Sequence, residues 1–145
     1  MLSPMEECRW INAPAEAGAS AIETEALEAL VGFPVKRIFW LTRIVQGQWR
    51  GRHAHRKSKL ATFAVVGSCR MTLDNGEQKE TVALNQYGPG LIVGPWIWHD
   101  LFDFSEPAVI LVAASTLYDE KEYLRDYDIF VQEARTRRKQ NKSER

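Results

Sequence analysis

Histidine and cysteine are scarce in this sequence of 145 residues, which contains three histidines and two cysteines. Cys8 and Cys69 lie far apart and have no Cys-x-x-Cys or other metal-ligand spacing, so we expect reduced, structural thiols. The N-terminus is acidic and has no apolar run, which argues against a signal peptide. No stretch approaches the ~20 apolar residues of a membrane-spanning helix. We therefore expect a cytoplasmic protein that does not act at membranes.

An excess of either charge is also lacking, because 19 Lys and Arg residues balance 19 Asp and Glu residues. A neutral chain has no overall field that would recruit nucleic acid, so no nucleic-acid partner is expected, and any anion site must be local. Hydrophobic residues make up 45% and charged residues 26% of the chain, an ordinary globular composition. The length fits one domain, which we place over residues 1–145.

Short extended segments separated by turn signals fill the middle of the chain. Asp74-Asn75-Gly76 is a strong hairpin signal between two of them. Short strands at this spacing, without intervening helices, predict an all-β fold, an antiparallel β-barrel or sandwich. Residues 1–34 are expected to form an irregular N-terminal arm. The predicted strands start near Val35 and cover 35–42, 59–66, 69–73, 77–84, 91–93, 99–104 and 108–114.

The C-terminal part changes its hydrophobic period from two residues to that of a helix. Tyr123, Tyr127, Phe130 and Val131 fall on one helical face, and the acidic start and basic end of this segment suit the helix dipole. We predict a helix over residues 119–138 that packs on the outside of the β-structure, with a frayed end beyond about 137.

The three histidines fall at only two places, His53 and His55 at the start of one strand and His99 at the start of another. Residues two apart in a strand point to the same face, so both rings of the pair can face the interior while Ala54 faces away. A histidine on a strand is usually an incidental core or surface residue. Because all three occur at these two places, a shared functional site is the better interpretation. A histidine pKa near 6.5 suits proton transfer at neutral pH.

The arrangement resembles a cupin, a jelly-roll barrel, because Gly51, Gly67 and Pro95 followed by His99 occupy the places of the cupin glycines and second motif. A cupin metal site often adds a Glu after the histidine pair. Here Lys59 and Leu60 stand in its place, and a lysine would repel a divalent ion. We favour a site without metal, although three histidines alone can form an open zinc site.

Longer motifs resemble one family over most of the chain, the dTDP-4-keto-6-deoxyglucose 3,4-ketoisomerases. They are VKRIFW at 35–40, RGRHAHR at 50–56, PWIWHD at 95–100 with DFS at 103–105, YDE at 118–120 and YLRDYD at 123–128. The resemblance implies a cupin fold, a homodimer with exchanged N-terminal strands, and isomerisation of a dTDP-linked keto sugar without a metal or redox cofactor. It also implies that His53 and His55 are the catalytic pair and that His99 lines the sugar pocket.

One departure concerns the identity of the sugar. Members of this family usually carry an Arg-Gly turn before the first long strand, where this chain has Glu16-Ala17-Gly18. That arginine helps to form the sugar pocket, so the sugar and the product configuration stay open. Arg56 keeps the positive charge of the family's usual lysine after the second histidine.

Moving a ketone from carbon 4 to carbon 3 shifts a proton through an enediol and involves no net oxidation. This agrees with the absence of a GxGxxG nicotinamide fingerprint. We expect His53 to be the shuttling base, and His55 to move or polarise the proton between the two oxygens. His99 would orient the sugar.

Other groups are candidates for the nucleotide part. The pyrophosphate would need local cations, for which Arg50 and Arg37 are candidates, with surface ion pairs as the alternative. Trp98 or Trp49 could stack on the base, although core packing is the simpler role for both.

Three other functions fit the same residues. The histidines could hold a metal in a cupin enzyme such as a dioxygenase. The domain could bind a sugar nucleotide or a partner without catalysis. It could also perform another rearrangement or a dehydration on a keto sugar carried by dTDP or UDP.

Overall fold

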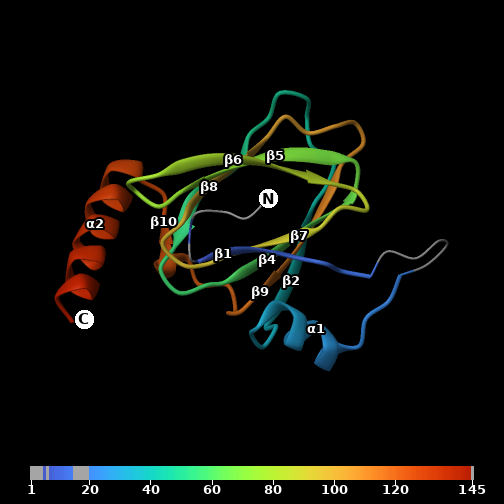
Figure 1. Cartoon of the computed structure of the whole chain (residues 1–145). Coiled ribbons are helices and arrows are strands. Elements are labelled where there is room, and N and C mark those ends of the chain that lie inside the picture. The colour runs from blue at the N-terminus through green and yellow to red at the C-terminus, as the bar shows by residue number, and fades with distance from the viewer. Residues whose placement is uncertain (1–4, 6, 15–19, 145) are drawn as a thin grey trace.

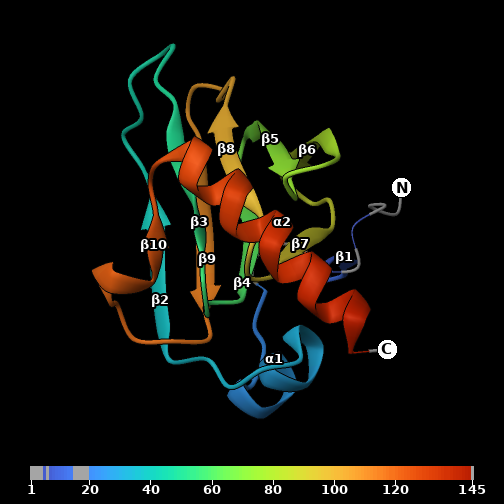
Figure 2. The same ribbon diagram turned by 90° about the vertical axis from the view of Figure 1, so that its left-hand side faces the viewer.

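Two antiparallel β-sheets face one another in the computed structural model, which describes Met5, residues 7–14 and residues 20–144 (Figure 1). One helix lies outside each sheet (Figures 1 and 2). In chain order the elements are β1 Cys8–Ile11, α1 Thr24–Val31, β2 Arg37–Leu41, β3 Arg50–His55, β4 Leu60–Val66, β5 Ser68–Asp74, β6 Lys79–Asn85, β7 Gly90–Val93, β8 Trp98–Phe102, β9 Val109–Ala114, a 3₁₀ turn Glu120–Glu122, β10 Tyr123–Leu124 and α2 Tyr127–Ser143.

The strand order is that of a jelly-roll. The first sheet runs β1-β7-β4-β9-β2 and the second β10-β3-β8-β5-β6, so most neighbours within a sheet are distant in sequence. Every pair is antiparallel, and the predicted hairpin joins β5 to β6 with Asp74 opposite Lys79. The all-β jelly-roll prediction is confirmed. The two sheets pack face to face, however, and hydrogen bonds do not close them into one continuous barrel.

The main core lies between the sheets because alternate residues of each strand point inward. Met71 and Leu73 on β5 are buried there, whereas Arg70 between Cys69 and Met71 is exposed. Leu60 and Val112 bring apolar side chains from the first sheet to the same core. Leu60, Met71 and Val112 of this core also line a cavity between the sheets.

The N-terminal prediction was wrong where it placed only an irregular arm over 1–34. β1 pairs with β7, and α1 covers the outer face of the first sheet with Val31 buried against Ile92. Gly32 ends α1 in the left-handed conformation at a φ of 83°. Arg9 then donates hydrogen bonds to the carbonyls of Leu30 and Val31, which ties the end of the helix to β1.

The C-terminal helix is confirmed, but its predicted start at 119 and its fraying beyond 137 were wrong. Asp119 accepts a hydrogen bond from the Lys121 N–H and opens a 3₁₀ turn, after which β10 pairs with β3. The helix α2 begins only after Asp126, whose side chain caps the N–H of Ile129, and it continues to Ser143. This interruption matters because it carries residues 122–125 back to the histidine strand.

The helix α2 packs on the outer face of the second sheet. Phe130 and Ala134 are buried against Ala54 and Trp98. Ala54 therefore faces away from the interior, as the sequence predicts for the residue between two inward-facing histidines.

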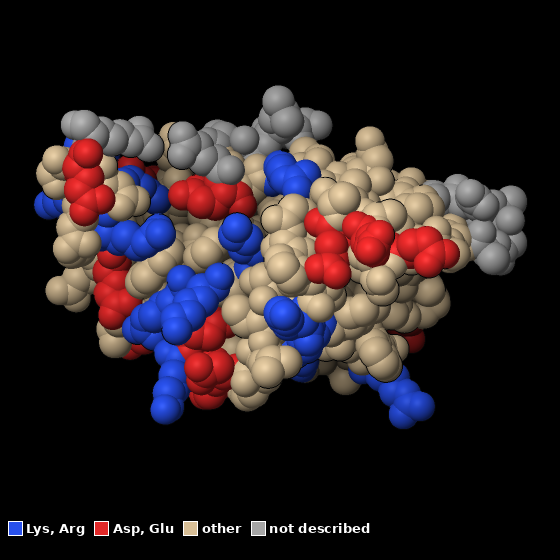
Figure 3. Space-filling model, turned by 90° about the horizontal axis from the view of Figure 1, so that it is seen from below, with Lys and Arg blue, Asp and Glu red and all other residues tan. Residues whose placement is uncertain are grey.

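Both signs of charge occur on the face shown in Figure 3, in keeping with the balanced composition.

Cys8 and Cys69 are free and buried, and burial raises the pKa of each thiol to about 12. None of the helices in the described part of the chain is long and apolar enough to span a membrane.

Candidate active site

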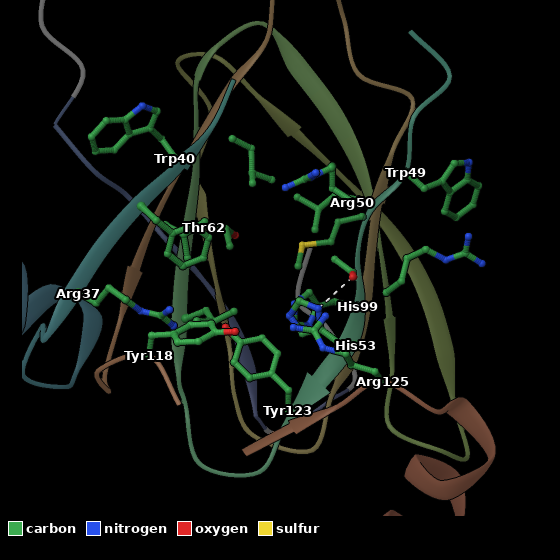
Figure 4. Close-up of a pocket in the computed structure, with 18 residues that line it drawn as sticks. Arg37, Trp40, Trp49, Arg50, His53, Thr62, His99, Tyr118, Tyr123 and Arg125 are labelled. Carbon is green, nitrogen blue, oxygen red and sulfur yellow. Dashed lines mark hydrogen bonds between the residues drawn. The ribbon is translucent and has the colours of Figure 1, made fainter. Parts of the chain in front are cut away.

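A cavity of about 520 Å³ opens between the two sheets (Figure 4). Strands of both sheets and the segment around β10 contribute to its wall. The lining residues are Arg37, Phe39, Trp40, Leu41, Trp49, Arg50, Gly51, Arg52, His53, Leu60, Thr62, Met71, His99, Leu101, Val112, Tyr118, Tyr123 and Arg125.

An irregular stretch of β3 positions the histidine pair. Gly51 and Arg52 both have left-handed backbone, at φ of 76° and 61°, and the register between β3 and β8 shifts between Gly51 and His53. Beyond this bulge His53 pairs directly with His99 on β8. A bulge redirects the side chains that follow it. Its consequence here is that residues from two strands point their rings at one another.

The three imidazoles converge, as the sequence predicts. The ring centroid of His53 lies 4.8 Å from that of His55 and 4.7 Å from that of His99. The rings of His55 and His99 are stacked with their centroids 5.7 Å apart. The Nε2 atoms of His53 and His55 lie 3.2 Å apart. His53 is half-buried at the cavity wall, whereas His55 and His99 are almost completely buried.

Each histidine is held through its Nδ1 atom. His53 Nδ1 lies 2.9 Å from the carbonyl of Gly51, and His99 Nδ1 lies 3.2 Å from the carbonyl of Ile97. A carbonyl can only accept, so both Nδ1 atoms carry the proton and both Nε2 atoms are left with a lone pair in the neutral ring. A neutral imidazole with a free Nε2 is a general base.

Burial keeps the three rings in the neutral form. It is the main cause that lowers the pKa of His53 to about 4, and the neighbouring His55 lowers it further. Burial also lowers the pKa of His99 well below its usual value. The pKa of His55 is lowered by burial as well, but a hydrogen bond to Glu122 opposes that shift. At neutral pH His53 is therefore available to accept a proton.

Glu122 is a functional candidate that the sequence reasoning missed. Its Oε1 atom lies 2.6 Å from Nδ1 of His55, although 67 residues separate the two in the chain. The cupin motif places its carboxylate after the histidine pair, where this chain has Lys59 and Leu60. Lys59 is exposed in the structure, and Leu60 lines the cavity. The YLRDYD motif at 123–128, which directly follows Glu122, was the signal in the sequence for this segment. Because the segment was predicted to be helical, its pairing with β3 was not expected.

Arginines and tyrosines form the cavity wall on either side of the histidines. Arg37 on β2 reaches toward Tyr118, with its guanidinium 5.4 Å from the ring centroid (Figure 4). The buried Nε and Nη2 atoms of Arg37 have no hydrogen-bond partner within the described part of the chain. The side chain of Arg50 points into the cavity. The structure thus brings both predicted arginines to the cavity that His53 and His99 line, while His55 lies buried behind His53.

Two further lining residues come from the segment after the 3₁₀ turn and were not predicted. The ring centroid of Tyr123 lies 4.4 Å from that of His55 and 4.9 Å from that of His53. Arg125 lies over the Tyr123 ring and is held by an exposed ion pair with Glu120. The sequence prediction placed this segment in a helix on the outside of the β-structure, away from the site.

The tryptophan prediction needs correction. Trp98 does not line the cavity, because its indole is 8% exposed and packs edge-on against Tyr127 under α2. It belongs to the outward-facing side of β8, the opposite side from His99, since neighbouring strand residues alternate. Trp49 does reach the cavity rim, where it stacks on Phe102 with the ring centroids 4.3 Å apart.

Sequence comparisons give the family. The family model described as FdtA, WxcM-like, C-terminal, matches residues 7–135. A TDP-4-oxo-6-deoxy-α-D-glucose-3,4-oxoisomerase of Aneurinibacillus thermoaerophilus is 39% identical over 100 residues, which cover 69% of this chain and 72% of the relative. The chain belongs to the FdtA-like sugar 3,4-ketoisomerase family.

Solved structures agree with this assignment. The sugar 3,4-ketoisomerase QdtA of Thermoanaerobacterium thermosaccharolyticum, in complex with TDP, superposes with a TM-score of 0.84 at 31% identity, over 92% of this chain and 98% of the other. A 3,4-ketoisomerase of Helicobacter canadensis gives 0.81 at 30% identity, over 89% and 98%. The predicted family and isomerase activity are confirmed.

The three histidines also have a geometry that could hold a metal ion. One nitrogen from each of His53, His55 and His99 can be chosen so that the three lie within 4.8 Å of one another, close enough to converge on an ion. The family membership favours the isomerase over the metal-dependent and non-catalytic alternatives. The Glu16-Ala17-Gly18 departure lies outside the described residues.

Proposed function

We propose that the protein converts a dTDP-linked 4-keto-6-deoxyhexose to its 3-keto isomer. The observation that carries the proposal is the neutral His53–His55 pair, of which His53 lines a cavity that also holds Arg37, whose Nε and Nη2 atoms have no hydrogen-bond partner among the described residues. One region of the cavity thus offers a base and another offers positive charge. A keto sugar joined to a pyrophosphate needs both. The TDP-bound QdtA structure supports the choice of nucleotide.

His53 is the proposed base that moves hydrogen between the two carbons. Its Nε2 takes the proton from carbon 3, and the electrons of that C–H bond form the C3–C4 double bond of an enediol. The same nitrogen then returns the proton to carbon 4. A positioned base typically contributes about 10²–10⁴-fold to such a step. The low pKa of His53, about 4, keeps its Nε2 unprotonated at neutral pH.

His55 and His99 have different proposed roles. His55 exchanges protons with the two oxygens, because its Nε2 points to the same place as that of His53. His99 is fully enclosed, and its ring contacts that of His53 from the paired strand. We assign it to the orientation of the sugar ring above the base.

Arg37 and Arg50 are the proposed pyrophosphate ligands. Guanidinium groups bind phosphate oxygens with two parallel hydrogen bonds. The Nε and Nη2 atoms of Arg37, which have no partner in the described part of the chain, suit that geometry. Trp49 at the rim takes the place of Trp98 as the aromatic candidate for the base. The Trp49 ring is 46% exposed; it stacks on Phe102, and the Arg52 guanidinium lies over it at 5.5 Å from the ring centroid. A base that stacks on Trp49 would take the place of this exposed guanidinium.

The reaction is tested by incubating the protein with dTDP-4-keto-6-deoxyglucose in D₂O and following the sugar by NMR. We expect signals of a 3-keto sugar, with deuterium entering at the reacting carbons to the extent that the base exchanges with solvent. His53→Asn should remove this turnover and leave TDP binding intact. An unchanged sugar with wild-type protein that binds TDP would instead favour a non-catalytic binding domain.

Metal removal separates the remaining alternative. Protein dialysed against EDTA should retain its turnover, because each proposed proton transfer uses only histidine nitrogens. Loss of turnover with EDTA, and its recovery on adding iron or zinc, would replace the acid-base proposal with the metal-dependent one.

We also propose that the protein acts as a homodimer in the cytoplasm. β2 is an edge strand of the first sheet, and Ile38 and Trp40 on it are 51% and 61% exposed. Edge strands with exposed apolar residues favour association with another chain. Free Cys8 and Cys69 suit a reducing compartment. Light scattering should give twice the mass of the chain, and Trp40→Glu should reduce it to the monomer.

A further inference from the structure

Glu122 is a buried carboxylate that contacts His55 but takes no part in the proposed proton transfers. It is 4% exposed, and four donors surround its two oxygens. Oε1 accepts from His55 Nδ1 at 2.6 Å and from the Ser58 hydroxyl at 2.5 Å. Oε2 accepts from the N–H groups of Lys57 and Ser58, at 3.1 and 3.3 Å. Burial raises the pKa of Glu122, but these hydrogen bonds outweigh it and lower the pKa below its usual value.

The backbone fixes Glu122 at this place. Its carbonyl accepts a hydrogen bond from the N–H of Arg56 at 2.8 Å, and the next residue, Tyr123, pairs directly with His55 in the β10–β3 ladder. The carboxylate therefore enters the site in a register set by strand pairing. A residue held in this way is suited to orient another side chain rather than to move during the reaction.

The contacts define where the protons of the histidine pair lie. Glu122 is an ionised acceptor, so His55 must donate through Nδ1, and His53 donates through Nδ1 to the Gly51 carbonyl. Both Nε2 atoms are then without a proton in the neutral rings, and they face one another at 3.2 Å. A proton placed between them belongs to His55, because Glu122 is hydrogen-bonded to that ring and stabilises its imidazolium more than that of His53.

We infer that Glu122 is a positioning residue that holds His55 in the Nδ1–H tautomer and stabilises its cation, so that His55 Nε2 exchanges the hydroxyl protons while His53 keeps the carbon proton. This inference rests on the proposed function. The two histidines differ in the acceptor at Nδ1, which is the neutral Gly51 carbonyl for His53 and the Glu122 carboxylate for His55. This difference is the basis for assigning them different roles.

The proton balance of the step is complete. His53 takes the carbon 3 proton, the C3–C4 double bond forms, and the electrons of the carbonyl π bond move to oxygen 4. Neutral His55 takes the oxygen 3 proton on Nε2, which forms its cation next to Glu122, and passes that proton to oxygen 4. The electrons left on oxygen 3 form a carbonyl at carbon 3, and carbon 4 receives the proton held by His53. Both histidines end as they began, and nothing is oxidised overall.

Glu122→Gln tests this inference because the amide cannot satisfy all four donors. Its carbonyl must face the Lys57 and Ser58 N–H groups, which leaves its NH₂ group toward His55. His55 Nδ1 must then accept, and its proton moves to Nε2. A carboxylate-to-amide change that reverses the tautomer of a catalytic histidine in this way costs about 10⁴-fold in kcat in serine proteases. We expect kcat to fall by about 10²-fold or more, with KM changed by less than about threefold.

The tautomers can be measured directly by long-range ¹H–¹⁵N NMR, because the chain has only three histidines. We expect Nδ1–H on His55 in the wild type, Nε2–H in Glu122→Gln, and Nδ1–H again in Glu122→Asp, with at least tenfold higher kcat than the Gln variant. The matched control is Glu133→Gln, which removes a half-exposed partner of Arg56 and should leave kcat and all three tautomers unchanged.

Two results would overturn the inference. One is an Nε2–H tautomer of His55 in the wild type, which can be read even if the variants do not fold. The other is a folded Glu122→Gln protein with wild-type kcat. If the wild type itself does not convert dTDP-4-keto-6-deoxyglucose, the proposed function fails, and so does the catalytic part of the inference. The NMR result then still decides whether Glu122 sets the tautomer of His55.

Discussion

His53 on β3 and His99 on β8 occupy directly paired positions, and their ring centroids lie 4.7 Å apart. The pairing depends on the bulge before His53, where the chain passes through Gly51 at a φ of 76°. A Cβ atom on Gly51 would come within 2.9 Å of the carbonyl oxygen of His99. One glycine therefore allows the two strands to approach closely at the point where the histidines meet.

Gly51→Ala should impair both stability and turnover. The left-handed backbone alone costs a residue with a Cβ about 1–2 kcal/mol, and the contact with the His99 carbonyl adds to that cost by pushing β8 away. We expect a loss of more than about 2 kcal/mol in the free energy of unfolding, measured with urea, and a lower kcat in the protein that remains folded.

Gly47→Ala is the matched control. Gly47 has a similar φ of 83°, but nothing lies within 4 Å of an added Cβ. It should show only the backbone cost and keep wild-type kcat. Equal losses of stability and activity in the two variants would mean that the close approach of β3 and β8 is unimportant.

The pH dependence of turnover should follow the lowered pKa of His53. The neutral ring is the base, so activity is present above the pKa of the folded protein and is lost as the pH falls through it. With burial lowering that pKa from 6.5 to about 4, kcat/KM should stay near its neutral value at pH 5.5. Circular dichroism at each pH checks that the fold persists. A half-loss of kcat/KM near pH 6.5 in folded protein would contradict this assignment.

Local sequence patterns predicted the strands well because each strand alternates between a core and an outer face. The His53 and His55 side chains were placed correctly for the same reason, and His99 was joined to them through the cupin resemblance. Glu122 could not be found in this way, since its contact with His55, 67 positions away in the sequence, depends on β10 pairing with β3. Local periodicity favoured a helix at Tyr123, and tertiary pairing overrode it.

The same limit explains the error at Trp98. Trp98 was a candidate to stack on the nucleotide base, but it is adjacent to the inward-facing His99, and adjacent residues of a strand face opposite sides. The inner or outer side of β8 is decided by the helix α2, which buries Trp98 against Phe130. The few residues around the motif do not indicate which face of the sheet a helix will cover.

Arg37→Gln should weaken binding of TDP more than it changes the chemical step. Hydrogen bonds to a charged group contribute about 1.5–3 kcal/mol each, which corresponds to roughly 10-fold or more in Kd. Titration calorimetry with TDP gives that constant, and kcat at saturating substrate should change by less than about threefold. Lys36→Gln removes the same charge from the neighbouring exposed position and serves as the control. If both variants weaken TDP binding equally, the positive charge of the surface accounts for the effect and Arg37 makes no specific contact with TDP.

Tyr127→Phe should loosen α2 from the second sheet without affecting turnover. The Tyr127 hydroxyl donates to the carboxylate of Asp74 at 2.5 Å, and this contact raises the pKa of the tyrosine to about 12. Asp74 is 3% exposed, so removing its donor leaves a buried carboxylate oxygen unsatisfied. We expect a loss of about 1–3 kcal/mol in the free energy of unfolding. Tyr87→Phe, at a side chain that is 82% exposed, should cost almost nothing. A similar loss in both variants would show that the Tyr127–Asp74 hydrogen bond does not hold the helix in place.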